Sequence, residues 1–241
     1  MIDIKNLDYL LYSSHKTGTQ SIKNTLIQNG YKSKHIHTLK HLISENLSCV
    51  DMSHEKVKEI FLNKIKDLNK SGKKLKIITC IRDPMDRLLS SFFQSYHSDK
   101  VMFNNYLPHE TPVMTLNKGN LINMYRSLII NNKLPGGYES LEELFDIFNF
   151  NELELIEKDN YYCYENEYVE IIVIKFIYFK ELTTDYLSKC LNITLRKSKS
   201  SNLSSDKIYY DKYLSLKTFF QRNIGLRVII EKRYNNLYNL L

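Results

Sequence analysis

Apolar strands and amphipathic helices alternate along the first 97 residues, and this alternation constrains the fold more than any other feature of the chain. The predicted strands span residues 7–13, 34–39 and 75–81, and the predicted helices span residues 19–29, 53–70 and 84–97. The run at 75–81 is almost continuously apolar, as central parallel strands are. Strand–helix units in this order predict an α/β fold, with three layers around a central, mainly parallel sheet.

The rest of the chain continues with the same kinds of element. Helices are predicted at 118–131, 140–150, 182–191 and from 206 to the end, and strands at 160–165 and 168–179, while 98–116 has an irregular pattern. We find no internal repeat and no linker. Because 241 residues are enough for one well-buried domain and short for two, we expect a single domain over 1–241.

The composition is that of an ordinary globular protein with a positive net charge. The formal net charge is +7 and the hydrophobic fraction 43%, which favours anionic partners but also fits a generally basic, solvated surface. The four cysteines form no C-x-x-C pair and indicate reduced thiols rather than a zinc site or a disulfide framework. With no signal-peptide pattern at the N-terminus and no apolar run long enough to span a membrane, we expect a cytoplasmic protein.

A loop with Gly18 joins the first predicted strand to the first predicted helix, at residues 14–21. The first N–H groups of a helix lack partners inside it, and the helix dipole is positive at that end. Lys16 adds a full charge, and Thr17, Thr19 and Ser21 add hydroxyl groups, so the loop predicts a phosphate cradle. Because Lys16 precedes Gly18, the loop is not a Walker A motif. A generic turn with a surface lysine is the alternative.

A second candidate anion site follows the strand at 75–81. Arg82 stands at the strand end, and Asp83-Pro84 begins the next helix. Residues Arg87, Ser90, Ser91 and Gln94 recur at three- and four-residue spacing and are predicted to share one face of that helix, opposite its buried apolar side. Arg82 and Ser90 could hold a second phosphate, unless the arginine pairs with an aspartate of the helix start. Two such sites on adjacent strand ends indicate one ligand with two phosphate groups.

These two segments, SSHKTGTQS and CIRDPMDRLLSSFF, resemble the two nucleotide motifs of sulfotransferases that use 3′-phosphoadenosine 5′-phosphosulfate (PAPS). The resemblance implies a sulfotransferase fold related to P-loop NTPases and covers roughly residues 7–97. It implies that the 5′-phosphosulfate is held by residues Lys16, Thr17, Gly18, Thr19, Gln20 and Ser21, with His15 positioning it. It also implies that Arg82 and Ser90 hold the 3′-phosphate.

The sequence is most similar to bacterial capsular-polysaccharide sulfotransferases, which pair such a loop with a His-x-His strand. The resemblance therefore implies a nucleotide co-substrate and a carbohydrate acceptor, and not a nucleic acid; the acceptor region is expected at about 98–165. The chain has no tryptophan to stack on adenine. It also lacks a clear late Arg-Lys-Gly segment, so Arg196 and Lys197 are the nearest candidates for a third phosphate contact.

Sulfuryl transfer needs a base for the acceptor hydroxyl and positive charge on the leaving phosphate. By the resemblance, Lys16 supplies the charge and a histidine or glutamate the base. His37 is the first candidate, because it lies nearer the carboxyl end of the strand at 34–39, with His35 and His41 next and Glu45 as a remote alternative. For each of these, an ordinary structural histidine is the competing interpretation. No metal ligand cluster is found.

Two other functions fit the loop less well. A P-loop-like kinase using ATP would need a Walker-type lysine and a magnesium-binding acid at a strand end, and neither is found in the sequence. A non-catalytic nucleotide- or glycan-binding protein would keep the phosphate contacts and show no loss of ligand binding on replacement of His37. The oligomeric state is left open by the sequence.

Overall fold

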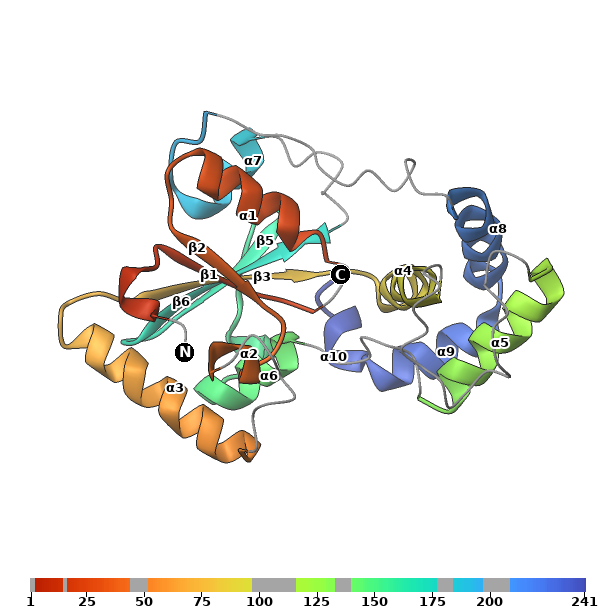
Figure 1. Cartoon of the computed structure of the whole chain (residues 1–241), viewed down its shortest axis with the longest axis horizontal. Helices are drawn as coiled ribbons and strands as arrows, with labels where there is room; N and C mark the ends of the chain where they lie inside the picture. The colour runs from red at the N-terminus through yellow and green to blue at the C-terminus, as the bar shows by residue number, and fades with distance from the viewer. Residues whose placement is uncertain are drawn as a thin grey trace. The chain divides into compact units, whose positions relative to one another are not determined.

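The structure is a computed structural model that describes residues 3–14, 17–43, 52–96, 116–132, 140–176, 184–196 and 209–241 (Figure 1). Its strands are β1 (Tyr9–Tyr12), β2 (Ser33–Ile36), β3 (Leu75–Ile81), β4 (Ile156–Lys158), β5 (Tyr161–Glu165) and β6 (Val169–Lys175). Its α-helices are α1 (Thr19–Gln28), α2 (Lys40–Ile43), α3 (His54–Asn69), α4 (Pro84–Tyr96), α5 (Lys118–Ile130), α6 (Ser140–Phe148), α7 (Thr184–Leu191), α8 (Tyr210–Gln221), α9 (Ile224–Arg233) and α10 (Asn235–Tyr238). Two short 3₁₀ turns are η1 (Ile4–Asn6) and η3 (Glu152–Glu154).

The chain divides into two compact units. The first unit comprises Met1–Ile81 and Glu139–Ser201 and contains the sheet, and the second comprises Arg82–Tyr138 and Asn202–Leu241 and is helical. The chain therefore leaves the first unit after β3 and returns to it before α6. Whether the two units behave as the single domain expected from the sequence stays a prediction.

The sheet of the first unit is mixed and has the order β2-β1-β3-β6-β5-β4. The first four strands are parallel, and β5 and β4 extend the sheet as antiparallel strands beside β6. The prediction of an α/β fold with a mainly parallel central sheet is confirmed. Strand β4 was missed because all three of its residues are exposed, so no apolar alternation marks it.

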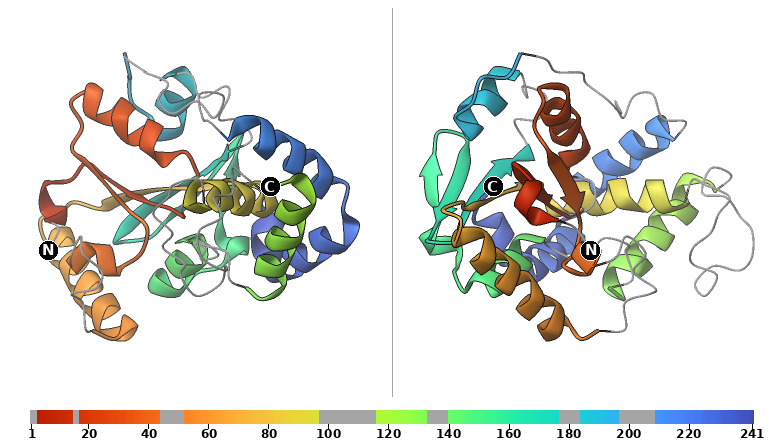
Figure 2. Two further views of the ribbon diagram at one scale, coloured as in Figure 1. Left: turned by 45° about the vertical axis from the view of Figure 1, so that its right-hand side comes forward. Right: turned by 60° about the vertical axis from the view of Figure 1, so that its left-hand side comes forward.

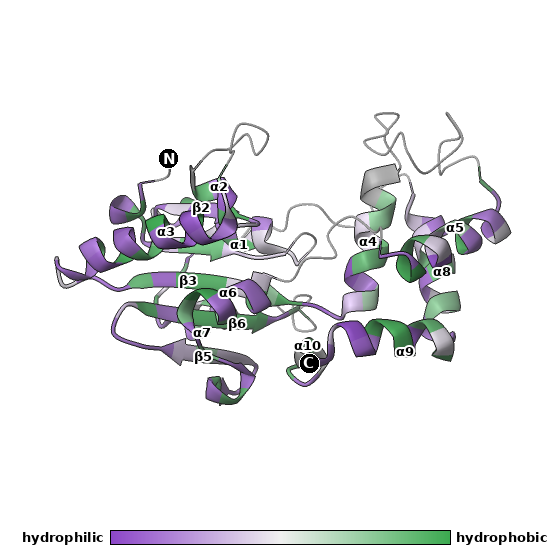
Figure 3. Ribbon diagram, turned by 90° about the horizontal axis from the view of Figure 1, so that it is seen from below, coloured by the Kyte–Doolittle hydropathy of each residue, from purple (hydrophilic) through white to green (hydrophobic). Residues whose placement is uncertain are grey.

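Helices cover both faces of the sheet. Helices α1 and α7 lie on one face and α3 and α6 on the other, as the three views of Figures 1 and 2 agree. The core of the α1/α7 face consists of Tyr9, Leu11, Ile22, Leu26, Ile78, Cys80, Ile172, Ile174, Leu187, Cys190, Leu191 and Leu195. Both β3 and β6 are apolar along most of their length (Figure 3), as strands buried on two faces must be. The expected three-layer arrangement is therefore confirmed.

Element boundaries follow local chemistry in most places. The Ser53 hydroxyl accepts a hydrogen bond from the Lys56 N–H and caps α3, and Gly30 takes the left-handed conformation (φ 86°) just after α1. The expected strand at 34–39 is too long, since β2 ends at Ile36. His37 lies in the bend that follows β2, and its Nδ1 contacts the carbonyl oxygen of Ser13.

The second unit is built on aromatic packing between its helices. The Phe92 and Tyr125 rings lie 5.2 Å apart, and the Tyr125 and Phe220 rings 4.5 Å apart, all three within the buried interior. The face predicted for α4 is wrong at two positions, because Ser91 is buried and Arg87 is 0% exposed. The Arg87 guanidinium lies over the Tyr234 ring at 5.6 Å. An arginine can be buried in this way because its delocalised charge stacks on an aromatic face.

Candidate active site

The loop between β1 and α1 brings the start of a helix to the carboxyl end of a central strand. Gly18 is the residue before α1, with φ 79° and ψ 1°, a left-handed conformation that side chains with a Cβ rarely adopt. Thr17 is buried, and its hydroxyl donates to the Ser14 carbonyl at 2.8 Å. His15 and Lys16 lie outside the described residues. The loop thus presents the positive end of α1 at the edge where α/β proteins bind ligands.

A buried network holds the first residue of α1 against β1 and β2. The Ser13 hydroxyl donates to the Thr19 hydroxyl oxygen at 2.8 Å, and Thr19 Oγ1 lies 2.9 Å from Nε2 of His35. Ser13 Oγ is itself 3.2 Å from the same ring nitrogen. The ring nitrogen of His35 is therefore within hydrogen-bond distance of both hydroxyl groups. His35 therefore connects the first residue of α1 to β2.

His37 follows β2 and is held by the neighbouring strand. Its Nδ1 lies 2.7 Å from the carbonyl oxygen of Ser13, so Nδ1 carries the proton and donates it. This tautomer puts the basic lone pair on Nε2. Burial lowers the pKa of His37 below its usual 6.5, and the hydrogen bond to Ser13 offsets part of that effect. The side chain is therefore neutral at pH 7 and chemically able to accept a proton.

His41 is oriented differently from the other two histidines. Its Nδ1 accepts from the backbone N–H of Thr38 at 3.3 Å and faces the N–H of His37 at 3.4 Å. Nδ1 is thus the acceptor, and the ring proton is at Nε2. The three rings form a row, with the His35 and His37 centroids 4.4 Å apart and those of His37 and His41 5.9 Å apart. The short distance between the His35 and His37 rings agrees with the expectation that the two side chains lie on the same side of the chain.

The start of α6 completes this region. A helix from residue 140 was expected, but no local pattern indicated that Ser140 would contact Ser14 and His37. The Ser140 N–H donates to the Ser14 hydroxyl at 2.9 Å, and the Ser140 hydroxyl donates to the His37 carbonyl at 3.3 Å. Ser140 is 0% exposed. Ser140 therefore connects Ser14, which follows β1, to the bend at His37, although 126 positions of sequence separate Ser140 from Ser14.

Arg82 and Ser90 lie in the second unit. Arg82 directly follows β3, and its Nη2 donates to the Tyr213 hydroxyl at 3.3 Å. The Asp83 carboxylate accepts from the Asp86 N–H at 2.9 Å, which confirms the predicted helix start at Pro84. Ser90 is half-buried on α4. The Asp86 carboxylate pairs with Lys217 at 2.5 Å, so its ion-pair partner is a residue other than Arg82.

The remaining predicted contacts are more scattered. Gln20 is exposed and donates to Asn24 one turn further along α1, and Ser21 is half-buried in the first turn. The Arg196 N–H donates to the Asn29 side chain, at the carboxyl end of α1. Ten helical residues put that end about 15 Å from Gly18. A phosphate contact of Arg196 stays a prediction. Lys197 and Glu45 lie outside the described residues.

Within 3–14, 17–43, 52–96, 116–132, 140–176, 184–196 and 209–241, no group of three or more His, Cys, Asp or Glu side chains could hold a metal ion. Over the same ranges, no helix combines the length and apolar character needed to cross a membrane.

Comparison with known proteins identifies a family. A family model described as the sulfotransferase family matches residues 10–149, which is more than half of the chain. The matched segment contains the β1–α1 loop, the three histidines and the whole of α4. Neither the curated proteins nor the solved structures contain a match to this chain.

Proposed function

The chain belongs to the sulfotransferase family, and we propose that it transfers the sulfuryl group of PAPS to a hydroxyl group of a carbohydrate. The acceptor that fits the sequence resemblance is a precursor of a bacterial capsular or surface polysaccharide. The observation that carries the proposal is the placement of His37, a neutral histidine with its basic nitrogen at Nε2, beside the strand end that leads into the phosphate loop.

The loop supplies the binding half of the mechanism. In the proposal, Lys16 and residues 17–21 hold the 5′-phosphosulfate, with the N–H groups at the start of α1 as donors. The Ser13–Thr19–His35 network fixes where those donors point. Arg82 and Ser90 are proposed from the sequence motif to hold the 3′-phosphate, with the arginine fork suited to a phosphate dianion.

His37 supplies the chemical half. Its Nε2 takes the proton of the acceptor hydroxyl as the acceptor oxygen bonds to sulfur, and the bond between sulfur and the bridging phosphate oxygen breaks. The electron pair of that bond leaves on adenosine 3′,5′-bisphosphate, whose new charge Lys16 stabilises. His35 is the weaker candidate for the base, because its Nε2 already faces two hydroxyl groups.

A ligand-binding experiment tests the nucleotide site. Thermal unfolding would be measured with adenosine 3′,5′-bisphosphate and with ATP plus magnesium, for the wild type, Lys16→Ala and Arg82→Ala. A specific ligand at 100 times its Kd adds about 2.7 kcal/mol of stability, and we expect this from the bisphosphate alone. A shift with ATP only would indicate a kinase, and a bisphosphate shift that survives both substitutions would refute the assigned contacts.

A matched pair of histidine variants tests the base. His37→Asn keeps an amide N–H for the Ser13 carbonyl, and His41→Asn keeps an acceptor for the Thr38 N–H. With ³⁵S-labelled PAPS and a panel of unsulfated polysaccharides, we expect His37→Asn to lose about 10²-fold or more in kcat while binding the bisphosphate as the wild type does. Equal losses in both variants would remove His37 from the mechanism, and turnover absent from the wild type would favour a binding protein.

A further inference from the structure

Helix α9 is apolar on two sides, although only one of them is packed against the second unit. Leu226 and Ile230 are buried, whereas Ile224 is 78% exposed, Val228 41% and Ile229 36%. Apolar residues on opposite sides of a helix are typical of helices that are covered on both sides. The exposed side of α9 is therefore an apolar surface that the described part of the chain leaves open.

Exposed apolar side chains are concentrated on this helix. Across the described ranges, eight large apolar side chains are exposed, and three of them lie on the ten residues of α9. At about 100° per residue, Ile224, Val228 and Ile229 fall within about 140° of the helix circumference. Single exposed apolar residues are common on protein surfaces, but a group of them marks an interaction site.

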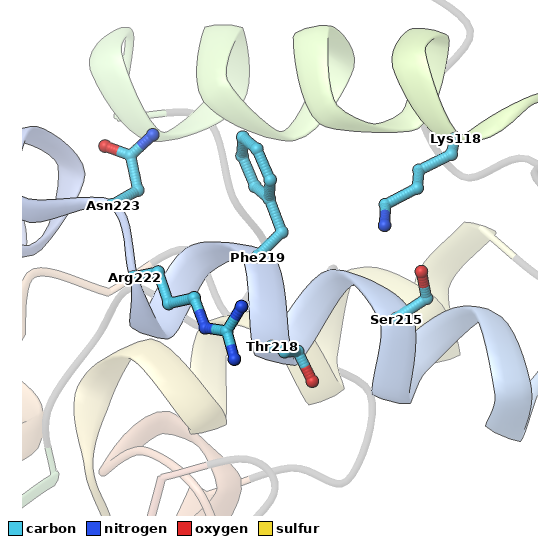
Figure 4. A pocket seen from close by; sticks show the side chains of 6 residues that line it. All are labelled: Lys118, Ser215, Thr218, Phe219, Arg222 and Asn223. Atoms are coloured by element: carbon cyan, nitrogen blue, oxygen red, sulfur yellow. The ribbon is translucent and has the colours of Figure 1, made fainter.

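Helix α9 is fixed to the second unit at both ends. Asn223 lies in the turn between α8 and α9 (Figure 4), and its side chain accepts a hydrogen bond from the Leu226 N–H at 3.2 Å. At the other end of the helix, Arg233 Nη1 donates to the Ile129 carbonyl at 3.2 Å. The exposed side is thus presented by a preformed helix, so a partner does not have to supply the free energy of helix formation.

The charge around the exposed side of α9 is positive. From residue 222 to residue 233 the chain has four basic residues and one acid, a net charge of +3. The acid, Glu231, pairs with Arg227 at 2.6 Å. Arg222 and Lys232 are exposed, and among the described residues neither has an ion-pair partner. The apolar side chains are therefore flanked by cations that are available to an anionic partner.

This charge distinguishes between the partners that could cover an apolar surface. A two-fold dimer across α9 would bring two copies of the same +3 segment together, because such an interface uses the same patch on both subunits, and like charges repel. An anionic bilayer surface attracts the cations and takes up apolar side chains at the boundary of headgroups and acyl chains. Lysine and arginine fit this boundary because their stems lie along apolar surface while their charged ends reach the headgroups.

We propose that the exposed side of α9 binds the surface of an anionic lipid membrane. Ile224, Val228 and Ile229 enter the boundary between headgroups and acyl chains, and Arg222 and Lys232 contact the lipid phosphates. The helix lies in the plane of the surface and does not cross it, since its ten residues extend about 15 Å and the hydrocarbon core is about 30 Å thick. This proposal does not rest on the proposed function, because none of these residues is assigned to the nucleotide or to the base.

Co-sedimentation of the full chain with lipid vesicles tests the apolar part of this surface. The vesicles would contain phosphatidylcholine alone, or phosphatidylcholine with about one third of the anionic lipid phosphatidylglycerol. The apolar variant is Ile224→Ser/Val228→Ser. Its control is Ile27→Ser/Leu153→Ser, which changes two apolar residues of the first unit that are 50% and 89% exposed.

A second pair of variants tests the charged part. The charge variant is Arg222→Gln/Lys232→Gln, and its control is Lys66→Gln/Lys158→Gln, at two exposed lysines of the first unit. Melting curves verify that all four variants fold. If the apolar double variant melts early, Ile224→Ser alone, at the most exposed of the three positions, repeats the measurement.

We expect the wild type to bind the anionic vesicles at least about 25-fold more strongly than the neutral ones, because each cation near an anionic surface contributes about five-fold. The charge variant should lose this preference, and the apolar variant should bind the anionic vesicles at least about ten-fold more weakly than the wild type. Both controls should stay within about two-fold of the wild type. No binding of the wild type, equal binding to both kinds of vesicle, or equal losses in a variant and its control would overturn the proposal.

Sedimentation velocity without vesicles separates a lipid surface from a second copy of the chain. The wild type and the apolar variant should have the same association state, and a dimer that Ile224→Ser/Val228→Ser dissociates would assign the surface to a second copy and overturn the proposal. Titration with adenosine 3′,5′-bisphosphate separates this proposal from the proposed function. If the wild type binds the anionic vesicles and not the bisphosphate, the proposed function fails while the membrane surface stands.

Discussion

A buried carboxyl group on α6 makes the stability of the first unit depend on pH. The Glu143 side chain is only 6% exposed, and burial raises the pKa of this carboxyl from 4.5 to about 7. The Leu39 backbone opposes this rise through a hydrogen bond, and the nearby Asp146 carboxylate adds to it. His54 Nδ1 lies 3.6 Å from the carboxyl and is the nearest titratable base.

The magnitude follows from the two pKa values. A group whose pKa is higher in the folded state stabilises the fold fully below its unfolded pKa, and that stability is lost as pH rises through the folded pKa. The shift from 4.5 to about 7 corresponds to at most about 3 kcal/mol, at about 1.4 kcal/mol per unit. The free energy of unfolding of the wild type should therefore fall between about pH 4.5 and about pH 8.

Two single substitutions on α6 test this reasoning. Glu143→Gln keeps an oxygen to accept from Leu39 and cannot ionise, whereas Glu142→Gln changes an exposed neighbour on the same helix. Urea unfolding followed by circular dichroism would give the free energy of unfolding from about pH 5 to about pH 8. We expect Glu143→Gln to match the wild type at the acid end and to exceed it by up to about 3 kcal/mol at the basic end. The argument fails if the Glu143→Gln and Glu142→Gln profiles are parallel.

Three further substitutions probe the candidate active site. Thr19→Val should lower the free energy of unfolding by about 1–2 kcal/mol in urea titrations, because it removes one buried and one part-buried hydrogen bond. Thr25→Val, at a buried threonine of the same helix outside this network, should lower it by less. Gly18→Ala should lower the free energy of unfolding by about 1–2 kcal/mol in the same assay, since φ at this position is 79°. It should also raise the Kd for adenosine 3′,5′-bisphosphate. An unchanged free energy of unfolding would contradict the left-handed conformation of Gly18. Ser140→Ala removes the hydroxyl that donates to the His37 carbonyl and should lower kcat with little change in bisphosphate affinity; an unchanged kcat would exclude a positioning role for Ser140.

Much of the first unit was predictable because its signals are local. The apolar run of β3, the Asp83-Pro84 start of α4 and the glycines after β1 and α1 each act within a few residues. Strand β4 and the early end of β2 were missed, because edge strands and bends depend on neighbours that the local pattern does not contain. The burial of Arg87 was missed for the same reason, since its aromatic partner Tyr234 is far along the chain.

The sequence by itself determined that a strand leads through Gly18 into a helix, and that two histidines alternate near the end of a second strand. Only the tertiary structure decided what those histidines do. The parallel pairing of β1 with β2 places Ser13 beside both rings, so that His35 anchors Thr19 while His37 is held with its basic nitrogen at Nε2. It also brought Ser140 to the same point from a distant helix. The physical reason is that propensity acts along the chain, whereas tautomer, burial and pKa depend on the atoms that the fold packs around a side chain.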